Sequence, residues 1–250
     1  MSSSYCSETD TETALRIDMA AGFRWLGKLG MSDLVAGSVV ARFPANTDWM
    51  STHVHDLNFG EIRASDMVKV DLKANFMGGS NRRVNFMAVN PAAFVFRARS
   101  DANVIIHAHA PAIMAVPGLT CGLLPASEPA FMFYNGIAYL DADFHFDDAY
   151  CEAVCSALGD KKAIIYRNHS FAVVGKDVPE AVLREYMLNQ ACEIQLSMQS
   201  TSQEISIPSK AEQIGHHKAF FGNPKYIYDG SLEWPGILRQ LDRDDRSYRD

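Results

Sequence analysis

The sequence has no apolar run of the roughly 18 to 20 residues that a membrane-spanning helix needs, no cysteine pair in CxxC spacing and no excess of basic residues. Its 250 residues carry a net charge of -7, so the basic footprint of a nucleic-acid-binding protein is missing. The polar, acidic start also lacks the basic and apolar regions of a signal peptide. We therefore expect a cytoplasmic protein whose partner is a small molecule, with neither a membrane nor a nucleic acid involved.

The cysteines are few and odd in number, which does not suit a complete set of disulfides. They are Cys6, Cys121, Cys151, Cys155 and Cys192. Cys151 and Cys155 lie four residues apart on a predicted helix, where two thiolates can hold a metal ion. The alternative, free thiols in a reducing compartment, is favoured for a chain without CxxC pairs.

The composition is that of one globular domain, with 48% hydrophobic and 21% charged residues. The chain shows no repeat and no linker in its middle, and its length suffices for a sizeable core. We predict a disordered start over residues 1–10, a domain over residues 11–225, and an extension over residues 226–250. The extension is expected to pack on the domain or on a neighbouring subunit.

Apolar periodicity predicts a mixture of helices and strands. Helical spacing favours helices over residues 11–29, 147–158 and 179–198. Asn90 and Pro91 have the preferences of an N-cap and a first helical position, which predicts a further helix to about residue 100. Pro111 is expected to open a short helix. Strands are predicted over residues 38–43, 67–72, 104–106, 136–140, 163–166 and 171–174. Because these elements mix without strict alternation, the class is α/β or α+β, with a central sheet covered by helices.

A pair of histidines follows the short apolar strand that ends at Ile106. Residues two apart on a strand point to the same face, so the imidazoles of His107 and His109 can chelate one ion. A catalytic zinc-type site needs a third donor and an open position for substrate. His169, which directly follows another predicted strand, is the best candidate for that donor.

Two other histidine pairs compete with this one. His53 and His55 have the same spacing, but no apolar strand precedes them, and we interpret their segment as a polar loop. His216 and His217 are adjacent, so their side chains diverge, and a solvated surface is the expected place for them.

Several segments, all in register along the chain, together resemble the class II aldolase/adducin family. RARSDANVIIHAH over residues 97–109 resembles its metal-binding core, as does YRNH over residues 166–169. The segment GEIRASDMVKVD over residues 60–71 resembles the family's EITASDLVKVD run, and LLPASE over residues 123–128 resembles its LLPLSQ segment. AGSVVAR over residues 36–42 resembles its early glycine turn and strand, and residues 233–243 resemble the end of many bacterial members. The resemblance covers roughly residues 12 to 245.

This resemblance implies a three-layer α/β/α fold around a mostly antiparallel sheet, and a homotetramer with active sites often at subunit contacts. The family's three metal ligands correspond to His107, His109 and His169. The ion expected first is Zn(II), with Mn, Fe or Co as alternatives. In the family's enzymes the ion stabilises an enolate-like intermediate, which serves aldol cleavage, epimerisation and decarboxylation.

The sequence also departs from the family pattern. The sugar-phosphate aldolases have a catalytic Glu nineteen residues before the first metal histidine, and that position is Ala88 here. Their two phosphate-binding serines correspond to Phe86 and Met87, and the Asn of their glycine turn corresponds to Ser38. Phe and Met donate no hydrogen bonds, and a buried unpaired phosphate is costly. We therefore predict against a sugar-phosphate substrate and keep Ser38 as a substrate-binding candidate.

Four further residues are candidates for the missing chemistry. Glu128 replaces the family's usual Gln and can act as a general acid or base, or be an ordinary surface carboxylate. Tyr134 can donate a proton to a carbanion, or simply pack against the sheet. The segment around His53 and His55 borders the substrate pocket in the family. We predict a catalytic role for His55 and a substrate-binding role for His53. Ser170 stands where the family usually has Gly, which would be strained if that position needs a positive φ.

Three functions remain open at this point. The first is a divalent-metal-dependent carbon–carbon lyase, a decarboxylase or aldolase, acting on a small non-phosphorylated hydroxy or oxo acid or an aromatic carboxylate. The second is a non-haem Fe(II) oxygenase on the same three histidines, although such sites usually prefer two His and one carboxylate. The third is a non-catalytic, adducin-like assembly module. We rank the lyase above the oxygenase on this ligand preference, and above the module because all three metal ligands are present.

Overall fold

The computed structural model describes residues 8–44, 46–77, 83–141 and 145–250, and within them seven strands form one sheet. The strand order is β3-β2-β1-β4-β7-β6-β5, and every neighbouring pair is antiparallel except the parallel pair β5–β6. The strands are β1 (Ser38–Arg42), β2 (Trp49–His53), β3 (Met67–Asp71), β4 (Val104–Ala108), β5 (Ile137–Asp141), β6 (Ala163–Arg167) and β7 (Ser170–Gly175).

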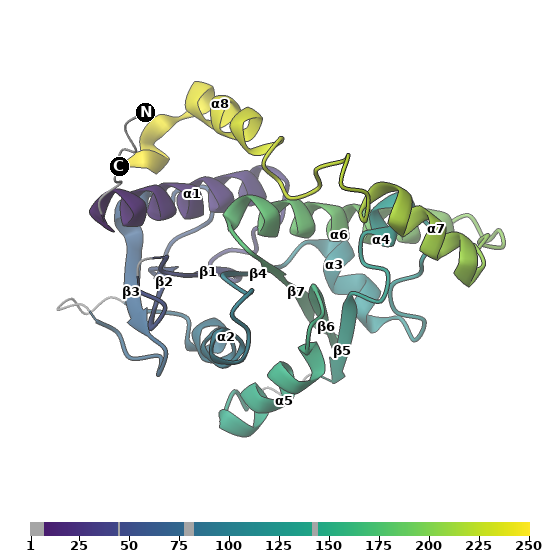
Figure 1. Cartoon of the computed structure of the whole chain (residues 1–250), viewed down its shortest axis with the longest axis horizontal. Helices are drawn as coiled ribbons and strands as arrows, with labels where there is room; N and C mark the ends of the chain where they lie inside the picture. The colour runs from purple at the N-terminus through teal and green to yellow at the C-terminus, as the bar shows by residue number, and fades with distance from the viewer. Residues whose placement is uncertain (1–7, 45, 78–82, 142–144) are drawn as a thin grey trace.

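Helices cover both faces of this sheet. Figure 1 shows α1 (Glu8–Lys28) and α6 (Val178–Gln199) on one face, and α2 (Phe86–Ala98) and α5 (Asp148–Leu158) on the other. The remaining helices are α3 (Pro111–Ala115), α4 (Glu128–Phe131), α7 (Lys210–Phe220) and α8 (Trp234–Asp244). The predicted three-layer α/β/α fold with a mostly antiparallel sheet is therefore confirmed. Across the part of the chain that the structure describes, no helix combines the length and apolarity that spanning a membrane requires.

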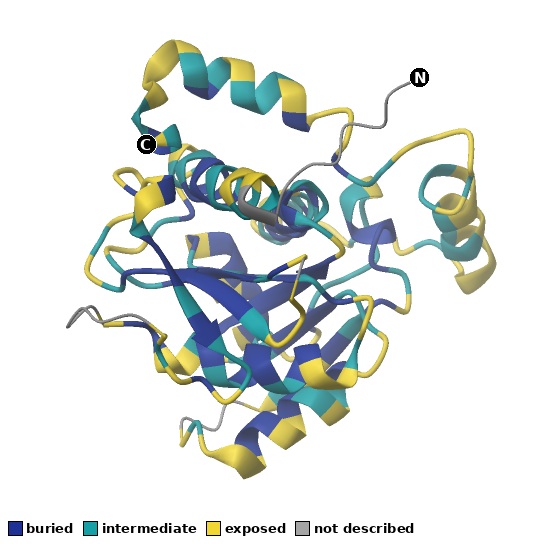
Figure 2. Cartoon of the chain, turned by 60° about the vertical axis from the view of Figure 1, so that its left-hand side comes forward, coloured by how far each residue is buried: buried dark blue, intermediate teal, exposed yellow. Residues whose placement is uncertain are grey.

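Each face of the sheet carries its own hydrophobic core. Along β4, Val104, Ile106 and Ala108 are buried in the core under α1 and α6. Ile105, between them, packs against the second core under α2 and α5. This alternation is the period of two that a strand imposes. Figure 2 shows the buried strands between helices whose outer surfaces are exposed. His107 lies on the face of Ile105, so it projects into the layer formed by α2 and α5.

The start of α2 differs from the prediction. The helix begins at Phe86 with Asn85 as its N-cap, whose side chain accepts a hydrogen bond from the Met87 backbone N–H at 3.1 Å. Pro91 lies inside the helix, and the predicted start at Asn90 is wrong. Proline forfeits one backbone hydrogen bond there. Burial of apolar residues on both sides of it keeps the chain helical.

The polar segment that ends at His53 is a strand, so the loop predicted for the segment of His53 and His55 is wrong at His53, whereas His55 lies outside the strand. β2 lies between β1 and β3, so both of its edges are paired. The polar residues Ser51, Thr52 and His53 are consequently buried inside the sheet. Backbone pairing on two sides outweighs the polarity from which the loop was predicted.

The two chain ends meet the domain in different ways. Residues 1–7, including Cys6 and most of the segment predicted to be disordered, lie outside the described residues, and Glu8 already belongs to α1. At the other end α8 lies along α1, where the Trp234 indole N–H donates to Asp18 Oδ1 at 2.9 Å. Arg24 pairs with Asp245 at 3.2 Å, and Tyr248 is fully buried. The C-terminal residues thus form an outer layer on the same chain's first helix.

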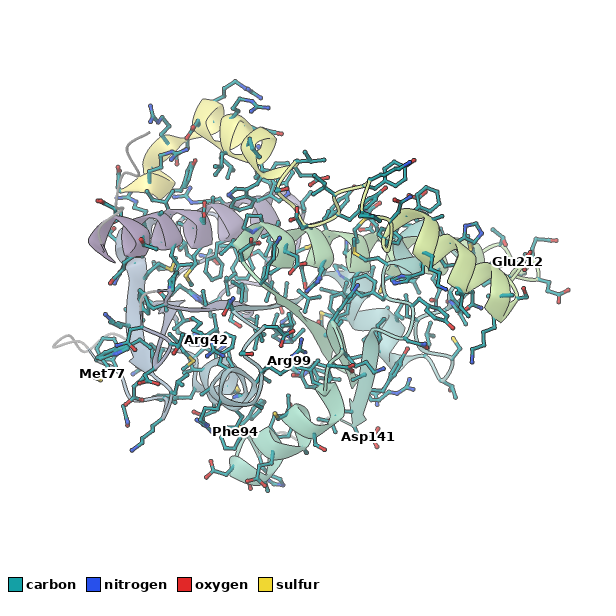
Figure 3. The ribbon with its side chains drawn as sticks, viewed as in Figure 1. Arg42, Met77, Phe94, Arg99, Asp141 and Glu212 are labelled. Carbon is teal, nitrogen blue, oxygen red and sulfur yellow. The ribbon has the colours of Figure 1, made fainter. Side chains whose placement is uncertain are left out.

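Two arginines connect α2 to the sheet through hydrogen bonds to backbone oxygens. Arg42, at the end of β1, donates to the backbone oxygens of Phe96 and of Arg99, the latter at 3.0 Å. The Arg99 guanidinium in turn donates to the Lys161 carbonyl at 2.6 Å, just before β6. Figure 3 shows Arg42 and Arg99 between the sheet and this helix, with Glu212 of α7 at the far end of the molecule. These bonds fix the C-terminal end of α2 relative to the sheet.

A buried carboxylate in α6 is expected to limit stability. Glu185 is fully buried, and neither of its oxygens has a hydrogen-bond partner among the described residues. Burial raises the pKa of Glu185 well above its usual value. The unfolded chain gives up this proton near pH 4.5, whereas the folded chain holds it. The contribution of Glu185 to stability is therefore fully present below about pH 4.5 and is lost as the pH rises.

We expect Glu185→Gln to raise the free energy of unfolding at pH 8 by about 1 to 3 kcal/mol, because each pH unit between the unfolded and the folded pKa of this carboxyl costs about 1.4 kcal/mol. At pH 4 the same substitution should have almost no effect, because the side chain is then neutral in both states. Urea unfolding at both pH values measures this difference, and Glu152→Gln on the exposed surface of α5 is the control. An equal effect at pH 4 and pH 8 would contradict the assignment.

Candidate metal centre

Three histidines converge at the end of β4. His107 is the fourth residue of that strand, His109 follows its end, and His169 lies in the turn between β6 and β7. β7 pairs with both β4 and β6, which brings the turn next to the strand end. The Nε2 atom of His109 lies 3.0 Å from that of His107 and 3.1 Å from that of His169.

The surroundings hold two of these imidazoles in the neutral form that binds a metal. His107 Nδ1 lies 2.8 Å from the Phe171 carbonyl oxygen. Because a carbonyl only accepts, Nδ1 carries the proton and the Nε2 lone pair is left for a ligand. Burial, with His109 and His169 as further causes, lowers the pKa of His107 to about 3. Burial and the neighbouring His109 also lower the pKa of His169. Both rings are therefore neutral at pH 7, as metal ligation requires.

The donor set fits a divalent ion. Three imidazole nitrogens that lie within 4.8 Å of one another suit Zn, Fe or Co better than Mg or Ca, which prefer oxygen. Among the described residues, this is the one group of three or more His, Cys, Asp or Glu side chains with metal-binding spacing. The alternative at Cys151 is not supported, because that thiol is fully buried and burial raises its pKa to about 11.

A cavity of about 200 Å³ opens beside the three histidines, on the sheet face covered by α2 and α5. Ser38 and His55 line it together with the histidines. Gly37, next to Ser38, has a φ of +96°, and a Cβ there would lie 2.9 Å from the His107 carbonyl oxygen. The absence of a side chain at this glycine turn therefore lets β1 approach the metal-ligand strand closely.

Comparison with known proteins identifies the family. The sequence profile of the family described as Class II Aldolase and Adducin N-terminal domain matches residues 17–196. The chain belongs to the class II aldolase/adducin family. A Caulobacter vibrioides protein, named only provisionally as an aldolase class 2 protein, is 30% identical over 97% of this chain and 94% of its own length. Mouse alpha-adducin is 34% identical over 74% of this chain, a match that spans 26% of the adducin.

Solved structures agree with this assignment. An aldolase II superfamily protein from Pseudomonas syringae superposes with a TM-score of 0.87 and 27% identity, over 96% of each chain. L-fuculose 1-phosphate aldolase from Glaciozyma antarctica PI12 superposes with a TM-score of 0.86 over 100% of this chain and 97% of its own. At 22% identity, the second likeness shows the shared fold alone.

The structure separates the other predicted site residues of this aldolase/adducin family member. Ser38 and His55 line the cavity. His53 packs against Phe23 of α1, with ring centroids 4.5 Å apart, because the strand directs it to the opposite face of the sheet. The structure therefore does not bring His53 to the cavity, against the role predicted for it.

Glu128 and Tyr134 also lie away from the cavity of this chain. Glu128 is exposed at the start of α4. The ring of Tyr134 lies 5.9 Å from that of His217 on α7, and neither predicted residue is among the cavity's lining side chains. Their catalytic roles remain predictions. Ser170 is an ordinary strand residue whose hydroxyl donates to the Ala108 carbonyl at 2.6 Å, and the left-handed backbone lies at Asn168, with a φ of 56°.

Tyr166, which was not predicted as a site residue, lines the cavity beside the three histidines. Its ring centroid lies 6.1 Å from that of His107 and 6.2 Å from that of His169. Burial raises the pKa of Tyr166, so its hydroxyl keeps its proton. The strand period could have predicted this, because Tyr166 lies two residues after Ile164 on β6 and therefore shares the face that bears the cavity.

Asp33 lies next to the Nδ1 side of the candidate ligand His109. Its Oδ2 lies 3.3 Å from His109 Nδ1, although without the alignment of a hydrogen bond. A carboxylate behind a ligating imidazole orients the ring and increases its basicity. We expect Asp33→Asn to weaken zinc affinity by about tenfold, the low end for such partners because Asp33 is half exposed. Competition with a zinc chelator measures this, and unchanged affinity would show that Asp33 has no such role.

Proposed function

We propose that this protein is a divalent-metal-dependent carbon–carbon lyase, a decarboxylase or aldolase. Its substrate is a small non-phosphorylated hydroxy or oxo acid, or an aromatic carboxylate. The convergence of the three Nε2 atoms beside a cavity carries the proposal. His107, His109 and His169 hold the ion, with Zn first in order and Mn, Fe or Co as alternatives. A bound divalent ion supplies a Lewis acid that polarises substrate oxygens.

The chain's own groups would position the substrate and move protons. The Tyr166 hydroxyl, kept protonated by its burial, would donate a proton to the carbanion that carbon–carbon cleavage leaves on the substrate. His55, at the cavity wall, is the candidate for binding a substrate carboxylate or accepting a proton. Ser38 offers a hydroxyl beside the ligand strand, to which its own strand is paired.

The cavity wall argues against a phosphorylated substrate. Among the described residues that line it, none is Lys or Arg, and Met87 and Ala88 line it at two of the positions compared with phosphate-binding and catalytic residues of sugar-phosphate aldolases. A phosphate dianion placed there would have few partners, and an unpaired buried charge is very costly.

The two other functions have weaker support. The similarity to alpha-adducin favours an assembly module. However, an assembly role does not account for three imidazoles converging beside a cavity. An iron oxygenase would use the same ligands and is distinguished by a requirement for oxygen.

A substrate screen tests the proposed reaction. The zinc-loaded protein is incubated without oxygen with hydroxy acids, oxo acids, aromatic carboxylates and sugar phosphates, while release of carbon dioxide and of aldehyde or ketone products is followed. We expect turnover of a non-phosphorylated acid that a chelator abolishes and added metal restores. Turnover only of sugar phosphates, or only with oxygen present, would overturn the proposal.

The proposal includes a cytoplasmic homotetramer. Support for assembly comes from Leu34, exposed at 78% close to the cavity, and from Phe86 and Met87, both more than half exposed at the start of α2. Apolar side chains gathered at a surface are typical of contacts between subunits. Light scattering that gives the mass of a single chain would contradict this part of the proposal.

A further inference from the structure

The cavity beside the three histidines has an apolar interior. Its floor is the sheet face formed by Ile105, Ile164, Ala172 and Val174, which belong to β4, β6 and β7. This face also bears His107, which lies two residues beyond Ile105 on the same strand. The polar and the apolar parts of the cavity are therefore consecutive positions on one face of one sheet.

Two helices supply the walls, each through residues at helical spacing. From α2 come Ala88, Pro91, Ala92 and Val95, and from α5 come Tyr150, Val154 and Leu158. Spacings of three, four and seven residues place each set on one side of its helix. These are the stripes by which α2 and α5 face the sheet. Beside the cavity, the residues of α2 that face the sheet have small side chains, and space is therefore left between the helices and the sheet.

The space is large enough for a ring. An apolar cavity of about 150 Å³ in another protein holds benzene, and the whole of this cavity, its histidine end included, measures about 200 Å³. A folded protein normally closes such voids, because an empty apolar cavity lowers stability in proportion to its volume. The hydroxyl-rich chain of a sugar would find few hydrogen-bond partners on the apolar walls, whereas an apolar group would find contacts throughout.

We propose that the substrate carries an apolar group of about the size of one six-membered ring or a branched alkyl chain, which binds between α2 and α5 while a polar head meets the three histidines. The inference rests on the proposed function, because the head group is assigned by the metal ligands. It narrows the substrate class to hydroxy acids, oxo acids or carboxylates with an aromatic or branched aliphatic side chain. Ala92 and Val154 set the size limit from the two walls.

Two metal chelators with the same head and different tails test this. Acetohydroxamate and benzohydroxamate both bind a metal through the same two oxygens, and they differ in a methyl against a phenyl group. We expect calorimetry on the zinc-loaded protein to show benzohydroxamate binding about 30-fold more tightly, as expected when an apolar group of that size leaves water. Ala92→Leu should reduce the preference to threefold or less by filling the space. Ala98→Leu, the same substitution on an exposed part of α2, should leave it unchanged.

The outcomes separate this inference from the proposed function. If neither hydroxamate binds, the metal site and the proposed function fail. If acetohydroxamate binds and benzohydroxamate binds no better, the metal site stands and the apolar subsite is wrong.

A second measurement needs no metal. Toluene added to the metal-free protein should shift the NMR resonances of Val95 and Val154 methyl groups. Val154→Phe, which fills the space from the other wall, should abolish that shift, and the Ala98→Leu protein should keep it. Absence of any shift in the metal-free natural sequence would overturn the inference, even if Ala92→Leu proved unable to fold.

Discussion

Replacing His107 or His169 with alanine is expected to lower the affinity for zinc by more than about a thousandfold. Loss of a residue that only supports a ligand costs roughly 10- to 100-fold, and these two residues are the proposed ligands themselves. Their Nε2 atoms each lie within hydrogen-bonding distance of the Nε2 of His109, so removal of either ring leaves two donors. Two imidazoles cannot complete the set of three protein ligands typical of catalytic zinc.

Metal content measured by plasma mass spectrometry on untagged protein checks this prediction. We expect about one ion per chain in the natural sequence and almost none in His107→Ala or His169→Ala. His216→Ala is the matched control, because that exposed histidine stacks on Phe131 at 4.7 Å and lies outside the cluster. A full complement of metal in either ligand variant, or its loss from the His216 variant, would show that the ion is bound elsewhere.

The second large effect concerns His53, which we expect to make the fold sensitive to acid. The side chain is fully buried, and neither ring nitrogen has a hydrogen-bond partner among the described residues. Burial, with His55 as a second cause, lowers the pKa of His53 to about 3. The unfolded chain takes up the proton near pH 6.5. The stabilising contribution of the neutral ring is therefore complete above pH 6.5 and is lost as the pH falls toward 3.

His53→Phe should remove this dependence. One pH unit between the two pKa values corresponds to about 1.4 kcal/mol, so the natural sequence should lose about 2 to 3 kcal/mol from this group between pH 6.5 and 4.5. The Phe variant keeps a ring against Phe23 and should be spared that loss. Urea unfolding at the two pH values compares them, with His216→Phe as the exposed control. Equal losses in the natural sequence and in His53→Phe would mean that His53 is not held neutral.

Much of the metal centre could be predicted from local rules. The alternation of side chains along β4 places His107 on the face of Ile105, and the strand before His169 brings that residue close. These conclusions depend only on the period of a strand and on the order of neighbouring strands. The family resemblance rests on motifs that surround these same residues, which is why the fold and the ligand set were predicted together.

Other features depend on contacts that the sequence does not reveal. His53 shares the spacing of the metal pair, yet β2 is paired on both sides and directs the ring to the opposite face. Glu128 belongs to a segment that resembles the family and Tyr134 comes shortly after it, but Glu128 is exposed at the start of α4, Tyr134 lies near His217 of α7, and neither lines the cavity. Ser209 and Glu212 have capping-box spacing, which marks the start of α7 and which apolar periodicity alone overlooks.

The apolar cavity is the clearest example of this limit. The spacing of Ala92 and Val95 on α2 predicts a buried face, and that of Val154 and Leu158 on α5 does the same. Whether two buried faces meet or leave a space depends on where each helix lies over the sheet. Here the position of α2 is fixed by Arg42 and Arg99, which bond to backbone oxygens far away in the sequence. A void of this kind therefore appears only once the layers are assembled.

The most direct test of the account is a crystal structure of the zinc-loaded protein with anomalous diffraction data collected at the zinc absorption edge. The account predicts one strong anomalous peak per chain at about 2.0 to 2.1 Å from Nε2 of His107, His109 and His169, with the remaining coordination open toward the cavity. A peak at another cluster, or none at these three histidines in a protein shown to contain zinc, would contradict it.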